Sequence, residues 1–192
     1  MKRCLSLCVL ALSAVAVMAS DPIQLSLTPD IAVYDRDTEI RGLSLNIWGE
    51  NPQTGAALGF VNGSTGTSVG FQLGLLGNYA DSYKGVMWGW ILNRVSNNFT
   101  GWQAALVNLN GGTLTGLQSG FFNCADGVKG VQYGCVNYTT ALKGVQLGIV
   151  NWAETCSAGV QIGLANVIQE NPWFSDLPDG LATGMILVNW RF

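Results

Sequence analysis

Three carboxylates near the start of the chain are the side chains with the residue types and spacing that a metal site requires. Asp35, Asp37 and Glu39 alternate along the sequence, so on a β-strand they would share one face. Carboxylate oxygens in such a group are ligands that calcium accepts. Arg36 and Arg41 stand beside them and favour local ion pairing in a solvated loop. We therefore treat the carboxylates as weak metal candidates and favour the loop.

A row of glutamines is the second polar feature with a regular spacing. Its members are Gln72, Gln103, Gln118, Gln132, Gln146 and Gln161. A side-chain amide both donates and accepts hydrogen bonds, so such a row can bond along its own length or contact a ligand. In a barrel the row would line the lumen or form a hydrogen-bonded plug, and in a solenoid it would form an outward amide ladder. We favour a structural role over a ligand or pore contact.

Several kinds of chemistry lack the residues that they need. The sequence has no histidine, which removes Ser-His-Asp and Cys-His catalysis and the commonest metal ligand. It has no phosphate-binding loop with Gly-Lys-Ser/Thr. Without Lys2 and Arg3 the net charge falls from −3 to −5, which gives no electrostatic attraction to nucleic acid. We expect no catalysis, no cofactor and no nucleic-acid partner.

The body of the chain is a tandem repeat of the pattern Gly-x-Gln-x-Gly-x-x-Asn. Eight units, each roughly 14–16 residues long, fill residues 55–168. They begin at Gly55, Gly70, Gly85, Gly101, Gly116, Gly130, Gly144 and Gly159. Within a unit, large apolar residues such as Val145, Leu147 and Ile149 alternate with glycine and glutamine. This period of two predicts β-strands of about 10–12 residues joined by short turns.

An up-and-down β-barrel of the outer-membrane type, with about 10–12 strands, is the architecture that we expect. Its Val/Leu/Ile/Trp face would meet lipid and its Gly/Gln face the lumen. A closed barrel pairs every backbone group inside a bilayer. It also explains why residues 51–167 contain very few charges.

A β-solenoid or β-roll is the alternative, with one unit in each coil. Val145, Leu147 and Ile149 would then line the core, and Asn151 would stack in an asparagine ladder at a corner. A solenoid runs in one direction throughout, so near-identical units follow naturally. Against it, an outer face of Gly, Gln, Gly and Val has almost no charge for contact with water.

The two ends of the chain indicate export. Residues 1–20 have the basic start, apolar run and small-residue site of a signal peptide, which leaves 21–192 as a single β-repeat domain. The alternating terminal strand, 181–192, ends in Phe192 and resembles the C-terminal β-signal of bacterial outer-membrane barrels. The remaining cysteines, Cys124, Cys135 and Cys156, form either one bridge with one free thiol or three small apolar fillers.

The repeat resembles that of the tandem surface-repeat proteins of diderm bacteria, a family first named from spirochaetes. Gly130 to Asn137 and Gly144 to Asn151 carry the likeness most closely. The resemblance implies surface exposure, but no reaction and no ligand. We therefore expect an exported outer-membrane or cell-surface protein with a structural, porin-like or surface-exposed role. Its partner would be outer-membrane lipid, with an unidentified surface ligand or partner protein as a further candidate. The alternative is a secreted or surface solenoid that acts as a binding or adhesion module.

Overall fold

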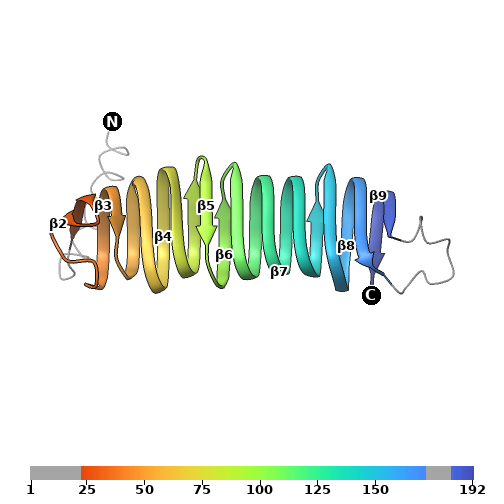
Figure 1. The fold of residues 1–192 in the computed structure, drawn as a ribbon, viewed down its shortest axis with the longest axis horizontal. Helices are drawn as coiled ribbons and strands as arrows, with labels where there is room; N and C mark the ends of the chain where they lie inside the picture. The colour runs from red at the N-terminus through yellow and green to blue at the C-terminus, as the bar shows by residue number, and fades with distance from the viewer. Residues whose placement is uncertain (1–22, 172–182) are drawn as a thin grey trace, which may run out of the picture.

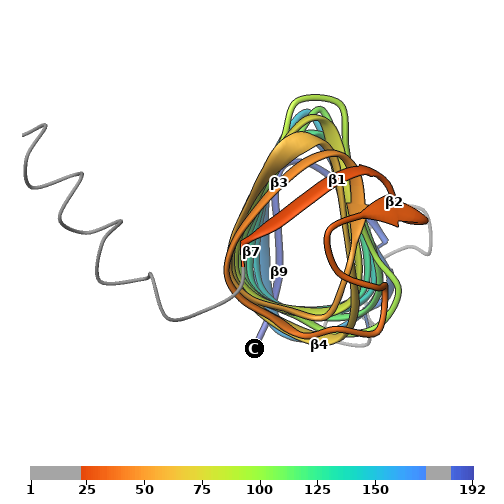
Figure 2. The same cartoon turned by 90° about the vertical axis from the view of Figure 1, so that its left-hand side faces the viewer.

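The chain winds into a long coil of stacked β-strands (Figure 1). The computed structural model describes residues 23–171 and 183–192, and these contain no helix. The strands are β1 (Gln24–Thr28), β2 (Ile31–Ala32), β3 (Ile40–Glu50), β4 (Gln53–Gly89), β5 (Leu92–Val95), β6 (Phe99–Ala104), β7 (Val107–Leu147), β8 (Val150–Glu170) and β9 (Gly184–Arg191). The three longest strands, β4, β7 and β8, continue around corners into further coils. Seen along the axis, the coils superpose in a rounded triangular outline (Figure 2).

Equivalent residues of successive repeats lie side by side in parallel register. Gly42 pairs with Gly55, and Gly101 with Gly116, in strands that run in the same direction. Antiparallel pairing occurs in the described residues only at the two ends, between β1 and β2 and between β8 and β9. The all-β prediction is confirmed. The prediction of a meander barrel is wrong, because a meander needs antiparallel neighbours, and the chain forms the alternative β-solenoid.

The solenoid is lined by polar side chains, which agrees with the inward Gly/Gln face expected of the barrel and reverses the orientation expected of the solenoid alternative. Gln146 and Asn151 are both 0% exposed, whereas Ile149 is 50% exposed. Val145 and Leu147 share the outer side with Ile149 and are half-buried there. The expectation that these three apolar residues line a solenoid core is therefore wrong.

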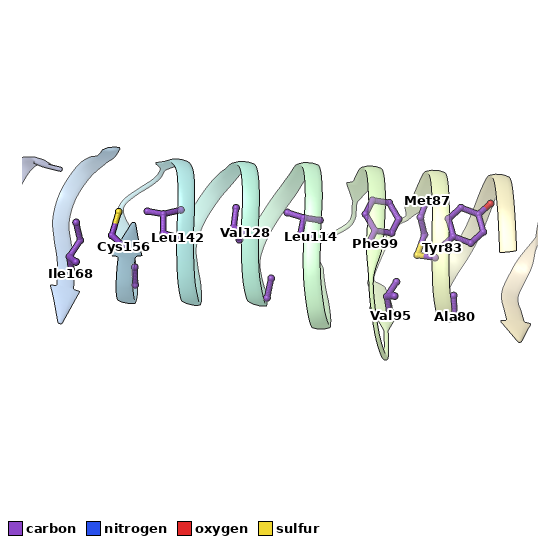
Figure 3. Packing of buried hydrophobic residues seen from close by; sticks show 12 residues of the cluster. Ala80, Tyr83, Met87, Val95, Phe99, Leu114, Val128, Leu142, Cys156 and Ile168 are labelled. Carbon is purple, nitrogen blue, oxygen red and sulfur yellow. The ribbon is translucent and has the colours of Figure 1, made fainter. Parts of the chain in front are cut away.

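The apolar part of the interior comes from two other columns of the repeat (Figure 3). The first lies two places before the opening glycine of a unit and contains Tyr83, Phe99, Leu114, Val128 and Leu142. The second lies two places after the asparagine and contains Ala80, Val95, Ala125, Ala153 and Ile168. The rings of Tyr83 and Phe99 stack with their centroids 6.2 Å apart. These columns form a continuous hydrophobic strip along the coil axis.

The opening glycine of each unit is required by the tight stacking of the coils. Gly116 has a φ of 128° and Gly130 a φ of 146°, in the region that favours glycine. A Cβ atom added at Gly130 would fall on the backbone carbonyl oxygen of Gly116 in the preceding coil. The repeated glycine thus allows each backbone to cross close over the last.

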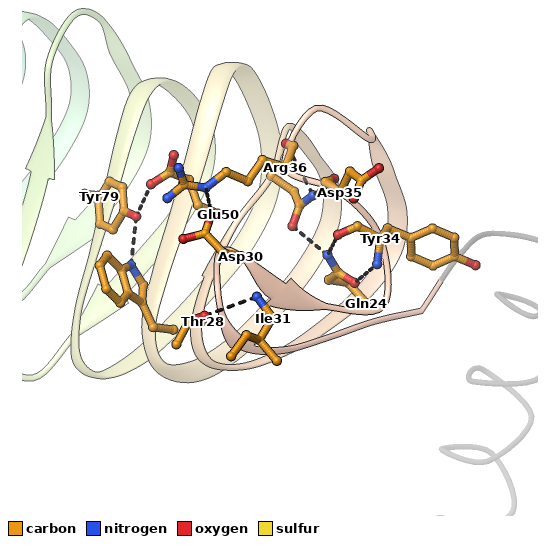
Figure 4. Close-up of polar contacts among 11 residues, drawn as sticks. Gln24, Thr28, Asp30, Ile31, Tyr34, Asp35, Arg36, Glu50 and Tyr79 are labelled. Carbon is orange, nitrogen blue, oxygen red and sulfur yellow. Dashed lines mark hydrogen bonds and ion pairs between the residues drawn. The ribbon is translucent and has the colours of Figure 1, made fainter.

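Antiparallel strands close both ends of the coil. At the C-terminal end β9 lies against the last coil, with Gln161 opposite Asn189. The predicted terminal strand, 181–192, is thus β9, which begins at Gly184; residues 181 and 182 and the predicted signal segment, 1–20, lie outside the described residues. At the other end the Gln24 side chain donates to the carbonyl oxygen of Tyr34 and to Asn51 Oδ1, both at 2.9 Å (Figure 4). These bonds hold the β1–β2 hairpin over the first coil.

Candidate functional site

The predicted glutamine row forms a hydrogen-bonded ladder inside the solenoid. Gln118 Nε2 donates to Gln103 Oε1 at 3.0 Å, and Gln132 Nε2 donates to Gln118 Oε1 at 2.8 Å. Two further links of 2.7 Å continue the ladder through Gln146 to Gln161. Gln72 stands apart, because Met87 takes the glutamine position of the unit between.

All six glutamines are 0% exposed, so the row does not reach solvent. The outward amide ladder that the solenoid alternative predicted is therefore wrong in its direction. The five glutamines of the ladder can be buried because each link pairs a donor with an acceptor that would otherwise be costly to desolvate, and Gln72 Nε2 donates instead to Ser64 Oγ at 3.1 Å. The ladder holds neighbouring coils together and presents no group to a ligand.

The asparagine of the repeat forms a longer ladder at one corner. Each side-chain amide donates to the side-chain oxygen of the next asparagine at 2.8–3.1 Å. Its members are Asn46, Asn62, Asn78, Asn93, Asn108, Asn123, Asn137, Asn151 and Asn166. The spacing of the ladder asparagines varies from 14 to 16 residues, yet the ladder is unbroken.

The three candidate metal ligands lie in the exposed loop between β2 and β3. The Glu39 carboxylate accepts hydrogen bonds from Arg41 at 3.0 Å and from Thr54 at 3.2 Å. The hydrogen bond from Arg41 lowers the pKa of Glu39. Across residues 23–171 and 183–192, no three His, Cys, Asp or Glu side chains come together in a group that could hold a metal ion. The structure therefore does not gather Asp35, Asp37 and Glu39 into a site.

The three cysteines of the repeat are free thiols. Cys156 is 1% exposed, and Cys124 and Cys135 are half-buried. Burial is the main reason that the pKa values of Cys124 and Cys156 are raised, which disfavours the reactive thiolate. The sequence left two alternatives open, and the structure agrees with the second, in which the three cysteines are small apolar side chains without a disulfide bond.

The outer side of the Gly-x-Gln-x-Gly-x segment is the surface feature that sets this solenoid apart, and we call it the apolar face. It consists of the three outward positions that alternate with the two glycines and the glutamine. Its most exposed members include Ile47, Phe60, Trp88, Trp90, Leu106, Phe121, Tyr133, Ile149 and Leu164, each between 48% and 68% exposed. The stacking of nine coils at about 4.8 Å makes this face roughly 40 Å long.

No charged residue interrupts the apolar face from Leu43 to Leu164. Trp88 and Trp102 stack on it with their ring centroids 6.1 Å apart, and Trp102 Nε1 donates to Ser119 Oγ at 3.0 Å. Monomeric soluble proteins rarely expose contiguous apolar patches larger than a few hundred Å². A strip of these dimensions therefore indicates a surface that is covered in use.

At its N-terminal end the apolar face deepens into a groove of about 830 Å³. Ile31 and Val33 from the N-terminal end of the chain line it together with Leu58, Phe60 and Leu75 from β4. None of the residues that line the groove is charged. The space is of the size that proteins use to bury small apolar ligands.

One edge of the apolar face carries basic side chains. Lys84, Lys129 and Lys143 each stand directly before the opening glycine of a unit and are exposed. Arg41 has the same position in front of Gly42. Three acidic residues of the coils, Asp81, Asp126 and Glu154, occur in the corner segment that precedes this edge. Of the five cations from Arg41 to Lys143, four lie beside the apolar strip, and Arg94 lies past the asparagine corner.

Comparisons with known proteins identify no relative of this chain. No family model, no curated protein and no solved structure matches this chain. The described residues also include no helix long and apolar enough to cross a bilayer.

Sequence reasoning identified the apolar residues of this face but missed the edge beside it. The regular Lys-Gly and Arg-Gly pairs were visible in the sequence. They form a basic edge only because parallel stacking of the coils places them in one column.

Proposed function

We propose that this chain is an exported, non-catalytic β-solenoid that attaches to the lipid surface of the cell through its apolar face. The observation that supports the proposal is the uncharged strip of exposed Leu, Ile, Phe and Trp side chains on one side of the coil. Burial of apolar surface contributes roughly 25 cal/mol per Å². The tryptophans, with an apolar ring and a polar N–H, suit the boundary between lipid and water.

The flat sheet face supports contact with lipid rather than with a peptide strand. Its backbone groups are already paired in the parallel ladders, so a peptide lying across it would leave its own backbone groups without partners. Hydrocarbon chains need no hydrogen-bond partner. The groove beside Phe60 gives such chains a deeper place to enter.

The apolar face could also bind a second copy of the chain, but the lysines at its edge disfavour such a dimer. If two strips met with antiparallel coil axes, two-fold symmetry would bring Lys129 and Lys143 of both copies to the same edge. If the axes were parallel, each lysine edge would meet the uncharged edge of the other copy. Neither arrangement supplies a negative partner, whereas a biological membrane does.

Flotation with phosphatidylcholine vesicles tests the proposal. We expect the protein without its first 20 residues to float with the vesicles, and the double variant Phe121→Asp, Ile149→Asp to remain at the bottom of the gradient. Trp152→Asp is the matched control, because Trp152 is 40% exposed but lies past the asparagine corner, on another side of the coil. A wild-type protein that stays monomeric and never floats would overturn the proposal. If the wild-type protein instead forms a dimer, and the double variant is a monomer, the apolar face binds a second copy of the chain.

A further inference from the structure

The lysines of the coils mark one position of the repeat. Every lysine in the described part of the chain directly precedes an opening glycine, and the three are Lys84, Lys129 and Lys143. Lys129 and Lys143 belong to successive units, whose backbones pass each other at Gly130 and Gly144. Neighbouring coils in such a sheet are about 4.8 Å apart, so the two ammonium groups extend from adjacent strands.

The corner that carries these two lysines is hollowed. A depression of about 200 Å³ lies there, lined by Lys129 and Lys143, by the hydroxyl-bearing residues Thr113, Thr155 and Ser157, and by the apolar residues Val128, Ala141 and Leu142. The Thr155 hydroxyl already donates to the carbonyl oxygen of Thr140 at 2.9 Å, which leaves the two ammonium groups as the main donors. Ammonium and hydroxyl groups are donors to phosphate oxygens. Neither lysine forms a salt bridge with any residue of the described ranges. The corner therefore presents two cationic donors to an anion from outside.

We infer that this corner binds the phosphate of an anionic phospholipid headgroup. The inference rests on the proposed function, because it is the apolar face that brings the corner to the membrane. With that face against the acyl chains, the lysine edge lies at the level of the headgroups. Their negative charge complements the two lysines, which the coil otherwise leaves without an acidic partner.

The position of the site selects a lipid headgroup over a soluble phosphate. The two lysines are exposed, and exposed ion pairs in water are worth little. At an anionic membrane surface each lysine contributes about a fivefold gain in binding. The same two side chains thus favour a phosphate at an anionic membrane surface over a dissolved one.

Vesicle binding with two lipid compositions tests the inference. We expect the wild-type protein to bind vesicles that contain about a third phosphatidylglycerol more tightly than pure phosphatidylcholine vesicles. The double variant Lys129→Gln, Lys143→Gln should lose about 20–30-fold in affinity for the mixed vesicles. It should bind pure phosphatidylcholine vesicles as well as wild type does. Arg94→Gln is the matched control, since Arg94 is exposed but follows Asn93, on another side of the coil.

Each remaining outcome has a defined meaning. Equal binding of wild type and the double variant to the mixed vesicles overturns the headgroup site and leaves the proposed function intact. A loss of about fivefold in Arg94→Gln, which removes one charge where the double variant removes two, shows that net charge alone acts, and this also overturns the site. If millimolar inorganic phosphate releases the protein from mixed vesicles, the corner is a soluble-phosphate site and the lipid assignment is wrong. Failure to bind either kind of vesicle removes the proposed function and this inference with it.

Discussion

The side-chain amide of Asn137 donates to the side-chain oxygen of Asn151 at 2.8 Å and to the carbonyl oxygen of Leu147 at 2.9 Å. Asn123 in turn donates to Asn137 Oδ1 at 2.9 Å. Each asparagine therefore connects three neighbouring segments while being fully buried. This arrangement lets a coil with a polar interior remain stable, since the ladder amides find partners along the coil, and the acceptors without one include Asn46 Oδ1 and Gln161 Oε1 at the ladder ends.

Replacing Asn137 by leucine should destabilise the solenoid by about 2–4 kcal/mol. The change removes an acceptor for Asn123 and a donor for Asn151 inside the coil, and a buried polar group without a partner costs about 1–3 kcal/mol. Urea unfolding followed by circular dichroism measures the loss. The exposed Asn97 provides the control, and Asn97→Leu should change stability by about 0.5 kcal/mol or less. Equal midpoints for both variants would contradict a ladder that stabilises the fold.

The inverted orientation of the strands predicts opposite results for two apolar residues of the same unit. Leu114 is 0% exposed and Phe121 is 56% exposed. Leu114→Ala should lower the free energy of unfolding by about 2–5 kcal/mol, because it leaves a cavity in the interior. Phe121→Ala should lower it by about 0.5 kcal/mol or less. A larger loss for Phe121 in the same urea experiment would support the orientation of the solenoid alternative, in which the apolar series lines the core.

The sequence was sufficient for the strand period and the repeat boundaries, because these depend on residues within one unit. The predicted strands of about 10–12 residues joined by short turns are wrong, since β4 has 37 residues and β7 has 41 and both continue around the corners. It also contained the clue to the true interior. Leu114 lies two places before Gly116 and therefore has the same strand parity as Gln118. The large apolar series at Val145, Leu147 and Ile149 was the stronger signal, and in the solenoid alternative it was placed in the core although it lies on the outer side.

The reason for that error is physical. A single unit shows a glutamine and an asparagine as unpaired polar groups, which favours placing them in water or in a lumen. Their partners are the same residues of the adjacent coils, so their satisfaction depends on stacking. Parallel register at Gly101 and Gly116 creates the ladder, and only then does burial of the amides become favourable. The lysine edge was unpredicted for the same reason.

Two glycines with positive φ should respond differently to alanine. Gly130→Ala places a Cβ on the backbone of Gly116, which cannot move without separating the coils, so we expect a loss of about 3 kcal/mol or more. Gly66 has a φ of 63° with no atom within 4 Å of the added Cβ. Gly66→Ala should therefore cost only the backbone strain of about 1 kcal/mol. Thermal unfolding of the two variants compares them, and similar melting temperatures would contradict close coil stacking at Gly130.

The thiols should react with iodoacetamide in the order of their exposure. Cys135 lies on the outer side of the coil and should be modified in the native protein, whereas Cys156 should react only after unfolding, since it is buried and its thiol pKa is raised. Peptide mass spectrometry after timed alkylation measures each site. Treatment of the intact protein with a reductant should leave its mass unchanged. A gain of two hydrogen masses would reveal a disulfide and contradict the three free thiols.

The hydroxyl of Tyr79 connects β3 to β4, since it donates to the Glu50 carboxylate and accepts a hydrogen bond from Trp48 Nε1 at 3.0 Å (Figure 4). Burial, followed by the hydrogen bond to Glu50, raises the pKa of Tyr79 to about 12. The folded protein therefore favours the neutral phenol more than the unfolded chain does. This contribution to stability is fully present below about pH 10, the ordinary pKa of tyrosine, and is lost as the pH rises towards about 12.

Tyr79→Phe isolates this effect. We expect wild type to be more stable than the variant at pH 8, and the difference to shrink steadily above about pH 10 as the Tyr79 hydroxyl ionises and meets the Glu50 carboxylate. Burial raises the pKa of Tyr83 as well, but Tyr83 is present in both proteins and cancels in the comparison. Urea unfolding at a series of pH values gives the difference directly. A difference that stays constant from about pH 9 to about pH 11.5 would show that the Tyr79 hydroxyl is not held in its neutral form by the fold.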